Sequence, residues 1–388
     1  MSSNPSASPA SSPSADSSSQ VDPDHLAALA LSLAPGLGPR LLSQLIEYFG
    51  SCSGILAQPA AELRKVPGIG AQIAAALNSP NLLRQATQLW SECHNSSVHL
   101  RFPGQPDYPK RLHEICDAPQ VLYVRGSLLP QDELAIAIVG SRRCSVYGIR
   151  QAERFASQLA RAGFTVISGL ARGIDAAAHR AALNASGRTL AVLPGGLNSI
   201  YPPEHQSLAD DITAHGALLS EMPLHQPVLP GLFPQRNRII SGLSLGVLLV
   251  EASARSGALY TARHAHEQNR DVFAVPGPVD SLASAGCNQL IRDGALLVRH
   301  VDDILEALGP LPTPLTLSPS QTVHSPRELT LNPIESQVLS HISPQPTPID
   351  EILRQLPAES SQILATLTVL EVRRLIRRLP GNFVVRYS

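Results

Sequence analysis

Short apolar runs that end in polar, often glycine-rich loops recur through the middle of the chain. These runs are residues 135–139, 164–167, 189–193, 217–219 and 247–250. Their aliphatic and β-branched composition is typical of strands buried on both faces of a parallel sheet. Segments with helical periodicity at 151–162, 174–183 and 260–268 alternate with them. The pattern predicts an α/β fold with one doubly wound, mostly parallel sheet over residues 101–308, with its loops on one edge.

The N-terminal part of the chain divides into two compositions. Residues 1–22 are almost entirely Ser, Pro, Ala, Asp and Asn, so we expect a disordered tail. Residues 23–100 have a helical pattern and contain the sequence Pro-Gly-x-Gly at 35–38 and again at 67–70. Each tetrapeptide is typical of the hairpin in a helix-hairpin-helix, SAM-like domain. Because few cations follow either turn, we favour structural packing over direct DNA contact.

The C-terminal part is predicted to hold a linker and a second folding unit. Residues 309–328 are rich in Pro, Ser and Thr, which indicates an extended linker. Residues 329–388 show three short helical patterns and two strands joined by a Gly-Asn turn, the order found in a winged helix. The third helical pattern contains no cation, whereas arginines cluster over 373–378. Phosphate contact through the wing and a protein-interaction role both remain open.

Composition limits the classes of function. The 388 residues are 43% apolar and carry a formal net charge of −1, so any nucleic-acid contact must come from a local cluster of cations. The five cysteines form no C-x-x-C pair, so we expect neither a metal site nor a disulfide framework. No apolar stretch approaches the length of a membrane span and no signal peptide is evident, so we expect a cytoplasmic protein without membrane contact.

Candidate anion-binding groups follow several of the predicted strands. Residues 135–139 end in Gly140-Ser141-Arg142, which places backbone N–H groups, a hydroxyl and a guanidinium at the carboxyl edge of the sheet. Arg236-Asn237-Arg238 adds two guanidinium groups and an amide, and Ser256-Gly257 precedes a helix. These groups predict a phosphate pocket in which Arg142 and Arg238 meet. Glu251 is expected to orient the pocket by pairing with one of the arginines.

The motifs of nucleotide-binding folds are missing from the expected places. Gly140 has no glycine partner before Gly148, and the second predicted strand ends in Ser168-Gly169 rather than in an acidic residue. This pattern argues against NAD or FAD. The lysines are Lys65 and Lys110, and neither belongs to a P-loop, which excludes ATP hydrolysis of that type. We expect no cofactor.

A series of ordered motifs provides a stronger identification. They are Gly140-Ser141-Arg142, Ser168-Gly169-Leu170-Ala171-Arg172-Gly173-Ile174-Asp175, Leu193-Pro194-Gly195-Gly196-Leu197-Asn198, Tyr201-Pro202, Phe233-Pro234 with Arg236-Asn237-Arg238, Ser256-Gly257-Ala258 and Pro276-Gly277. In this order, from about Tyr108 to Leu308, the chain resembles the DNA processing protein A family, also called DprA or Smf.

The resemblance implies an extended Rossmann-like fold and a non-catalytic, homodimeric protein that binds single-stranded DNA. It further implies a role in natural transformation, where such a protein protects incoming strands and helps to load the RecA recombinase. The resemblance maps a pocket for backbone phosphates and a neighbouring base onto Ser141, Arg142, Arg236, Asn237 and Arg238. With the loops of the same sheet edge, the predicted DNA-binding residues are Gly140, Ser141, Arg142, Ser168, Gly169, Arg172, Gly195, Gly196, Asn198, Arg236, Asn237, Arg238, Ser256 and Gly257. Family members often carry a lysine near the loop after the third strand, where this chain has Asn198 and His205.

An enzymatic alternative rests on two features. Asp175 and His179 are four residues apart, as in a base with its orienting carboxylate, although a pair that only fixes the helix is favoured. Pro194-Gly195-Gly196 resembles the start of the P-G-G-x-G-T-x-x-E signature of nucleoside monophosphate phosphoribohydrolases. The Gly-Thr and the glutamate of that signature are missing, so the alternative lacks its catalytic carboxylate.

Overall fold

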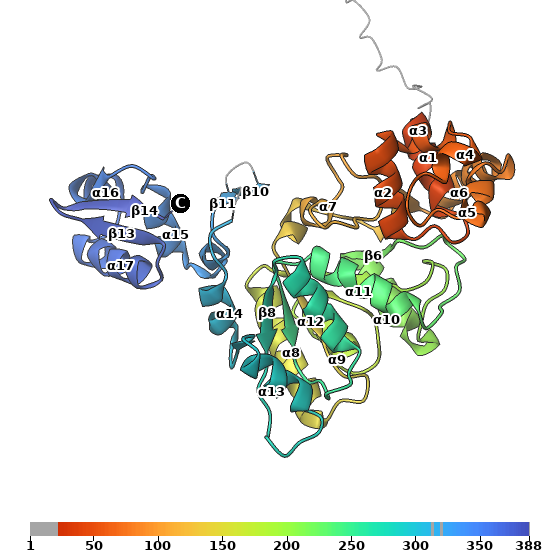
Figure 1. Cartoon of the computed structure of the whole chain (residues 1–388). Coiled ribbons are helices and arrows are strands. Elements are labelled where there is room, and N and C mark those ends of the chain that lie inside the picture. Colours follow the sequence, from red (N-terminus) through yellow and green to blue (C-terminus); the bar gives the residue numbers. More distant parts are fainter. Residues whose placement is uncertain (1–21, 312–313, 319–320, 388) are drawn as a thin grey trace, which may run out of the picture.

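The computed structural model describes residues 22–387 except 312–313 and 319–320, so the predicted tail lies outside the described residues apart from Asp22. A helical N-terminal module, a central α/β unit and a small C-terminal module follow one another along the chain (Figure 1). Among the described helices, none is long and apolar enough to cross a membrane.

The central unit is built on a nine-stranded sheet. In spatial order the strands are β1 (Val98–Arg101), β2 (Leu122–Gly126), β6 (Ala217–Ser220), β5 (Thr189–Val192), β4 (Thr165–Ser168), β3 (Ala135–Val139), β7 (Gly246–Leu249), β8 (Asp271–Ala274) and β9 (Leu296–Leu297). β1 and β2 are antiparallel additions, and all pairings from β6 to β9 are parallel. The predicted doubly wound, mostly parallel sheet is confirmed. β1 overlaps the end of the domain predicted to be helical, and β8 and β9 were not predicted.

Helices cover both faces of this sheet. They are α7 (Lys110–His113), η1 (Pro130–Glu133), α8 (Val146–Arg161), α9 (Ile174–Asn184), η2 (Pro203–His205), α10 (Gln206–His215), α11 (Leu232–Gly242), α12 (Ala258–Glu267), α13 (Ala285–Arg292) and α14 (Val301–Ala307). Alternation along β3 separates the two layers: Ile136 and Ile138 pack with α8 and α9, and Val139 packs with α11 and α12. β3, β4, β5, β6 and β7 are therefore buried along their whole length, which explains the continuous apolar runs.

The strand order reverses between β3 and β7. The chain runs outward from β3 through β4 and β5 in one direction and from β7 through β8 in the other, so the loops after β3 and β7 diverge. Open α/β sheets bind ligands in the crevice at such a switch point.

The N-terminal module contains two helical hairpins that pack on each other. Its helices are α1 (Pro23–Ser32), α2 (Pro39–Phe49), α3 (Cys52–Leu56), α4 (Ala60–Leu63), α5 (Ala71–Leu77) and α6 (Asn81–Asn95). Gly36 and Gly68 adopt φ values of +82° and +89°, which favour glycine. A Cβ atom on Gly68 would lie 2.7 Å from Leu41 of α2, and one on Gly36 would lie 3.4 Å from Ile73 of α5. The two turns are therefore close packing elements.

The segment predicted as an extended linker is structured over its described residues. β10 (Leu315–Ser318) and β11 (Gln321–Val323) form a hairpin, and η3 (Pro326–Thr330) follows. Val323 is buried in the same cluster as Leu305 and Leu308, so the hairpin packs against the α/β unit. The prediction of an extended linker is wrong here because it rested on Pro, Ser and Thr content and overlooked Leu315 and Val323.

The last module has its own core. Its elements are α15 (Pro333–Ser340), β12 (Thr347–Pro348), α16 (Ile349–Gln355), α17 (Ser360–Val372), β13 (Ile376–Leu379) and β14 (Phe383–Arg386). β13 and β14 pair as the antiparallel wing, and β12 joins them. The predicted winged helix is confirmed, with three helices and a turn at Gly381-Asn382.

Candidate functional site

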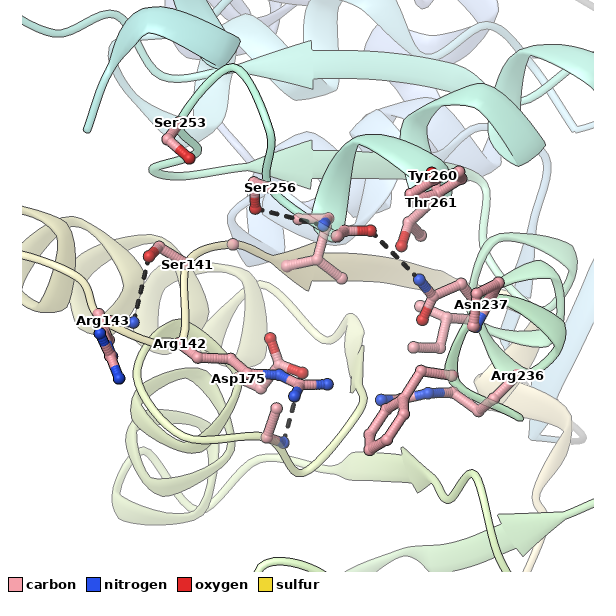
Figure 2. A pocket seen from close by; sticks show the side chains of 18 of the residues that line it. Ser141, Arg142, Arg143, Asp175, Arg236, Asn237, Ser253, Ser256, Tyr260 and Thr261 are labelled. Carbon is pink, nitrogen blue, oxygen red and sulfur yellow. Dashed lines mark hydrogen bonds between the residues drawn. The ribbon is translucent and has the colours of Figure 1, made fainter. Parts of the chain in front are cut away.

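A pocket of about 850 Å³ lies at the switch point, and we call it the switch-point pocket. Its walls come from the loop after β3, the first half of α11, and the segment that joins β7 to α12 (Figure 2). The sequence brings these parts together because parallel strands all end at the same edge of the sheet. The lining combines guanidinium groups, hydroxyls and aromatic rings.

Arg142 and Phe233 meet across this pocket. The guanidinium carbon of Arg142 lies 4.4 Å from the centroid of the Phe233 ring, within the range of a cation–π contact. The ring of Tyr201 approaches Phe233 edge-on, with 6.0 Å between centroids. Arg142 is exposed, so stacking positions its guanidinium and leaves its N–H groups available. Arg143 turns away from the pocket centre (Figure 2).

Arg236 contributes a second guanidinium to the pocket from α11. Its side chain is buried, and Nη1 donates a hydrogen bond of 2.8 Å to the Val192 carbonyl oxygen. Burial lowers the pKa of Arg236 to about 10, which still leaves it protonated at neutral pH. Gly169 provides the room for this group, because a Cβ atom there would lie 1.6 Å from Nη1.

Asp175 and His179 are held by separate partners. Buried Asp175 accepts hydrogen bonds from the N–H groups of Gly169 at 3.2 Å and Ala171 at 3.4 Å. Burial raises the pKa of Asp175, and the charge of Arg236 opposes that shift. His179 Nδ1 contacts the Thr189 hydroxyl at 2.7 Å, and burial lowers the pKa of His179 to about 3. Neither a catalytic dyad nor the favoured helix-fixing pair is formed.

The β7–α12 segment completes the pocket with polar groups. Asn237 Nδ2 donates to the Gly257 carbonyl oxygen at 3.4 Å, which ties α11 to the start of α12. The Ser256 hydroxyl accepts from the Ala258 N–H at 3.3 Å. Gly257 directly precedes the first turn of α12, where backbone N–H groups favour an anion.

The predicted site residues separate into two groups. Those that line the switch-point pocket are Gly140, Ser141, Arg142, Arg236, Asn237, Ser256 and Gly257. Those outside its lining are Ser168, Gly169, Arg172, Gly195, Gly196, Asn198 and Arg238. The second group has structural contacts of its own.

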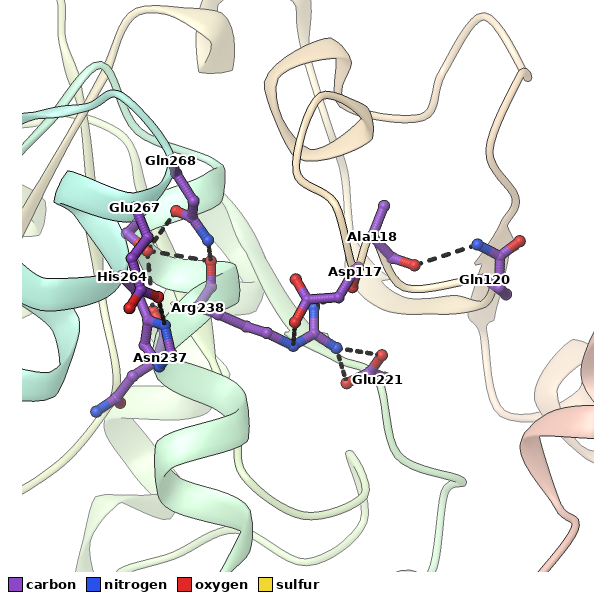
Figure 3. Close-up of polar contacts among 10 residues, drawn as sticks. Asp117, Ala118, Gln120, Glu221, Asn237, Arg238, His264, Glu267 and Gln268 are labelled. Carbon is purple, nitrogen blue, oxygen red and sulfur yellow. Dashed lines mark hydrogen bonds and ion pairs between the residues drawn. The ribbon is translucent and has the colours of Figure 1, made fainter. Parts of the chain in front are cut away.

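Arg238 shows the largest departure from the sequence prediction. It is buried on a different side of α11, where it forms an ion pair of 2.5 Å with Glu221 and one of 3.5 Å with Asp117 (Figure 3). Burial raises the pKa of Glu221, and the charge of Arg238 opposes that shift. Residues two apart on a helix point about 200° apart, so Arg236 and Arg238 cannot share one face. The prediction that Arg142 and Arg238 meet in one pocket is wrong.

Glu251 also differs from its predicted role. Its carboxylate accepts hydrogen bonds from the N–H of Ser145 at 2.9 Å and from the Ser145 hydroxyl at 2.5 Å. Ser145 is the N-cap of α8, so Glu251 fixes the start of that helix. The predicted ion pair with Arg236 or Arg238 is wrong, because both guanidinium groups are held by other partners.

The other predicted residues outside the pocket lining stabilise or pack the loops at the carboxyl edge of the sheet. The Ser168 hydroxyl donates to the Ile138 carbonyl oxygen at 2.6 Å, and Arg172 pairs with Glu204 at 2.5 Å. Asn198 accepts a hydrogen bond from Arg125. A Cβ atom on Gly195 or Gly196 would clash with the segment 223–228, so these glycines allow two loops to pack.

Several lining residues were not predicted. They are Arg143, Asp175, Tyr201, Phe233, Tyr260 and Thr261, among others. The sequence holds a signal for part of this set, because aromatic residues make up only 4% of the chain. Tyr201 and Phe233 each precede a proline in or beside the loops of the carboxyl edge. Aromatic rings beside arginines are typical of stacking sites.

Comparison with known proteins agrees with this geometry. Residues 99–309 match the family described as DNA recombination-mediator protein A, and residues 323–382 match the DprA winged helix domain. Protein Smf of Escherichia coli is 40% identical over 79% of this chain and 82% of its own length. Protein Smf of Synechocystis is 34% identical over 91% of this chain and 96% of its own length.

A solved structure shares the same architecture. The DNA processing protein A of Streptococcus pneumoniae superposes with a TM-score of 0.61 at 33% identity, covering 74% of this chain and 99% of that one. The sheet order, the winged helix and these similarities agree with one another. The chain belongs to the DNA processing protein A family, also named DprA or Smf.

Proposed function

We propose that the switch-point pocket binds the sugar-phosphate backbone of single-stranded DNA and stacks one of its bases. The observation that carries this proposal is the Arg142–Phe233 contact in the same pocket as the buried guanidinium of Arg236. Guanidinium groups bind phosphate through charge-assisted hydrogen bonds, and an aromatic ring beside them suits a base of any sequence. The matching family is described as DNA recombination-mediator protein A, and the similar protein from Streptococcus pneumoniae is a DNA processing protein.

The shape of the pocket favours a single strand over a duplex. Arg236 lines the pocket and is buried, so a phosphate must enter the pocket to approach this guanidinium. A flexible strand can bend inward and turn one base onto a ring, whereas a duplex keeps its bases stacked and paired. Because backbone contacts and stacking carry little sequence information, the preference for particular sequences is expected to be weak.

The wider role that we propose builds on this binding. We propose a non-catalytic, homodimeric protein of natural transformation that covers incoming strands and helps to load RecA. The description of the family as a recombination mediator supports this role. Among the described lining residues, the acid is Asp175, and backbone N–H groups and burial fix it. This arrangement suits binding and argues against general base catalysis in the pocket.

The binding proposal is tested with Arg142→Gln and Phe233→Leu in anisotropy titrations of labelled oligo-dT. Loss of a charge-assisted contact is worth about 1.5–3 kcal/mol, so Arg142→Gln should weaken binding by about ten- to a hundredfold. It should also reduce the salt slope by about 0.7. Arg263→Gln is the matched control, since Arg263 is exposed on α12 and pairs with Glu267. Equal affinities for Arg142→Gln and this control would overturn the pocket assignment.

Three further assays test the preference for single strands, the loading of RecA and the absence of catalysis. An unlabelled single strand should displace oligo-dT far better than a duplex of equal length. RecA should assemble faster on strands precoated with a single-stranded DNA-binding protein when this protein is added, and the Arg142→Gln variant should lose that effect. No free base should be released from nucleoside monophosphates. Loading unaffected by the protein would refute the mediator role and leave the binding result intact.

A further inference from the structure

A second cationic surface lies outside the switch-point pocket. A groove of about 510 Å³ runs along α8 and α9 and is lined by four arginines, Arg150, Arg154, Arg161 and Arg180. We call it the α8–α9 groove. The acid among its described lining residues is Glu153, which makes no ion pair there. A chain with a net charge of −1 therefore concentrates cations on one helical surface.

The groove arginines have few partners inside the protein. All four are exposed, and no ion pair involves them within the described part of the chain. Arg154 donates a hydrogen bond to the Arg299 carbonyl oxygen, whereas Arg150 and Arg180 have no side-chain hydrogen bond among the described residues. Elsewhere several guanidinium groups of low exposure pair with carboxylates, as Arg188 does with Asp132 at 2.6 Å. Neighbouring like charges without partners oppose each other and favour an anionic ligand.

The groove begins close to the pocket. α8 starts at Val146, just after the loop that carries Arg142, and α9 contributes Asp175 to the pocket and Arg180 to the groove. Arg143 is exposed in the same loop and turns away from the pocket centre (Figure 2). The distance along α8 from Arg150 to Arg161 is about 16 Å at 1.5 Å per residue. A stacked strand would cover that length with about five nucleotides.

We propose that the α8–α9 groove binds the phosphates of the same DNA strand as it leaves the switch-point pocket. This proposal rests on the proposed function, because it assigns the strand a path beyond the pocket. The arginines of the groove supply phosphate contacts without rings for stacking, so the groove adds affinity that depends on strand length and on salt. The competing partner is an acidic protein surface, including one on a second copy of this chain.

The test is a length series of oligo-dT, from about 4 to about 20 nucleotides, measured with the full chain. The groove variant is Arg150→Gln with Arg180→Gln, which spares the Arg154 hydrogen bond and the last turn of α8. The charge-matched control is Arg64→Gln with Arg84→Gln, two exposed arginines of the N-terminal module. Glutamine is a good helix former, so the melting temperature of the groove variant should match that of the native chain.

The shortest strands, which fill only the pocket, should bind the groove variant and the native protein equally. Longer strands should bind the groove variant about tenfold less tightly, since each lost phosphate contact is worth about fourfold at about 0.15 M salt. The control pair should leave the length dependence unchanged. Unaltered binding of long strands by the groove variant would overturn the proposal, as would an equal loss at every length.

Two further outcomes separate this proposal from the pocket assignment. If Arg142→Gln binds short strands normally while the groove variant still loses affinity for long ones, the pocket assignment fails and the groove remains. If the native protein binds no strand of any length, both fail. A groove variant that binds long strands normally but changes its sedimentation behaviour would place an acidic protein surface there instead and overturn the proposal.

Discussion

Gly169 is predicted to act through the space that it leaves for Arg236. A Cβ atom on Gly169 would lie 1.6 Å from Nη1, whereas non-bonded heavy atoms in contact lie about 3.5 Å apart or more. In Gly169→Ala the guanidinium must therefore shift by about 2 Å, which breaks its 2.8 Å hydrogen bond to the Val192 carbonyl oxygen. Arg236 is buried, so it cannot swing freely into solvent.

The expected loss of stability follows from these contacts. A hydrogen bond from a charged group contributes about 1.5–3 kcal/mol, and overpacking costs about 1–3 kcal/mol. We expect Gly169→Ala to lower the free energy of unfolding by about 3 kcal/mol. In an Arg236→Gln background the shorter side chain removes the clash. Because the φ of Gly169 lies outside the left-handed region, alanine should then be neutral or stabilising by up to about 1 kcal/mol.

The assay is a double-mutant cycle by urea unfolding, with oligo-dT binding measured on the same four proteins. The coupling free energy between the two positions should be about 3–4 kcal/mol, and Gly169→Ala should weaken binding about as much as Arg236→Gln does. Gly231→Ala serves as the control, because a Cβ atom on Gly231 would contact nothing within 4 Å. Equal costs of Gly169→Ala in both backgrounds would refute the reasoning.

Two further predictions concern buried groups outside the pocket lining. Glu221→Gln should lower the free energy of unfolding by about 3–5 kcal/mol, because it leaves the buried charge of Arg238 poorly compensated. The control Glu267→Gln, which removes an exposed ion pair, should lower it by less than about 1 kcal/mol in the same urea assay. Similar losses in the two variants would contradict this prediction. Burial holds the pKa of His179 at about 3, so this side chain gains a proton between pH 8 and pH 5 only in the unfolded chain. As the pH falls over that range, the free energy of unfolding should therefore decrease by about 2 kcal/mol more in the native protein than in His179→Asn. Identical pH profiles of the unfolding midpoint in the two proteins would exclude this role of His179.

The strands could be predicted wherever burial is two-sided. β3 is buried at every position and coincides with the apolar run 135–139. β9 was not predicted because it has only two residues and both are exposed. β1 was not predicted because Val98–Arg101 closely follows a long helix, and its alternating polar residues fit a helix end as well as a strand. Strand pairing with β2 decides its conformation, and no local pattern encodes a partner so distant in sequence.

The location of the pocket could be predicted from the sequence, but the residues that line it could be predicted only in part. The rule that ligands bind at the carboxyl ends of parallel strands placed Gly140–Arg142 and Ser256-Gly257 correctly at the pocket. Arg238 was misplaced because the segment was treated as a cluster and not as part of α11, whose period separates it from Arg236. Gly169 and Gly196 fit close approaches of other chain segments, and one sequence cannot distinguish that use from ligand contact.

The arginines of this protein differ mainly in whether the fold has already given them a partner. Arg238 is buried and Arg188 is half-buried, and both pair with carboxylates, so their charge is neutralised where it lies and cannot attract a phosphate. Arg142 rests on an aromatic ring, which orients the guanidinium without cancelling its charge. Arg236 donates to a carbonyl oxygen, and that contact likewise leaves a net positive charge. A nearly neutral chain can therefore attract anions locally, because carboxylates form ion pairs with one set of arginines and, among the described residues, none with Arg142 or Arg236.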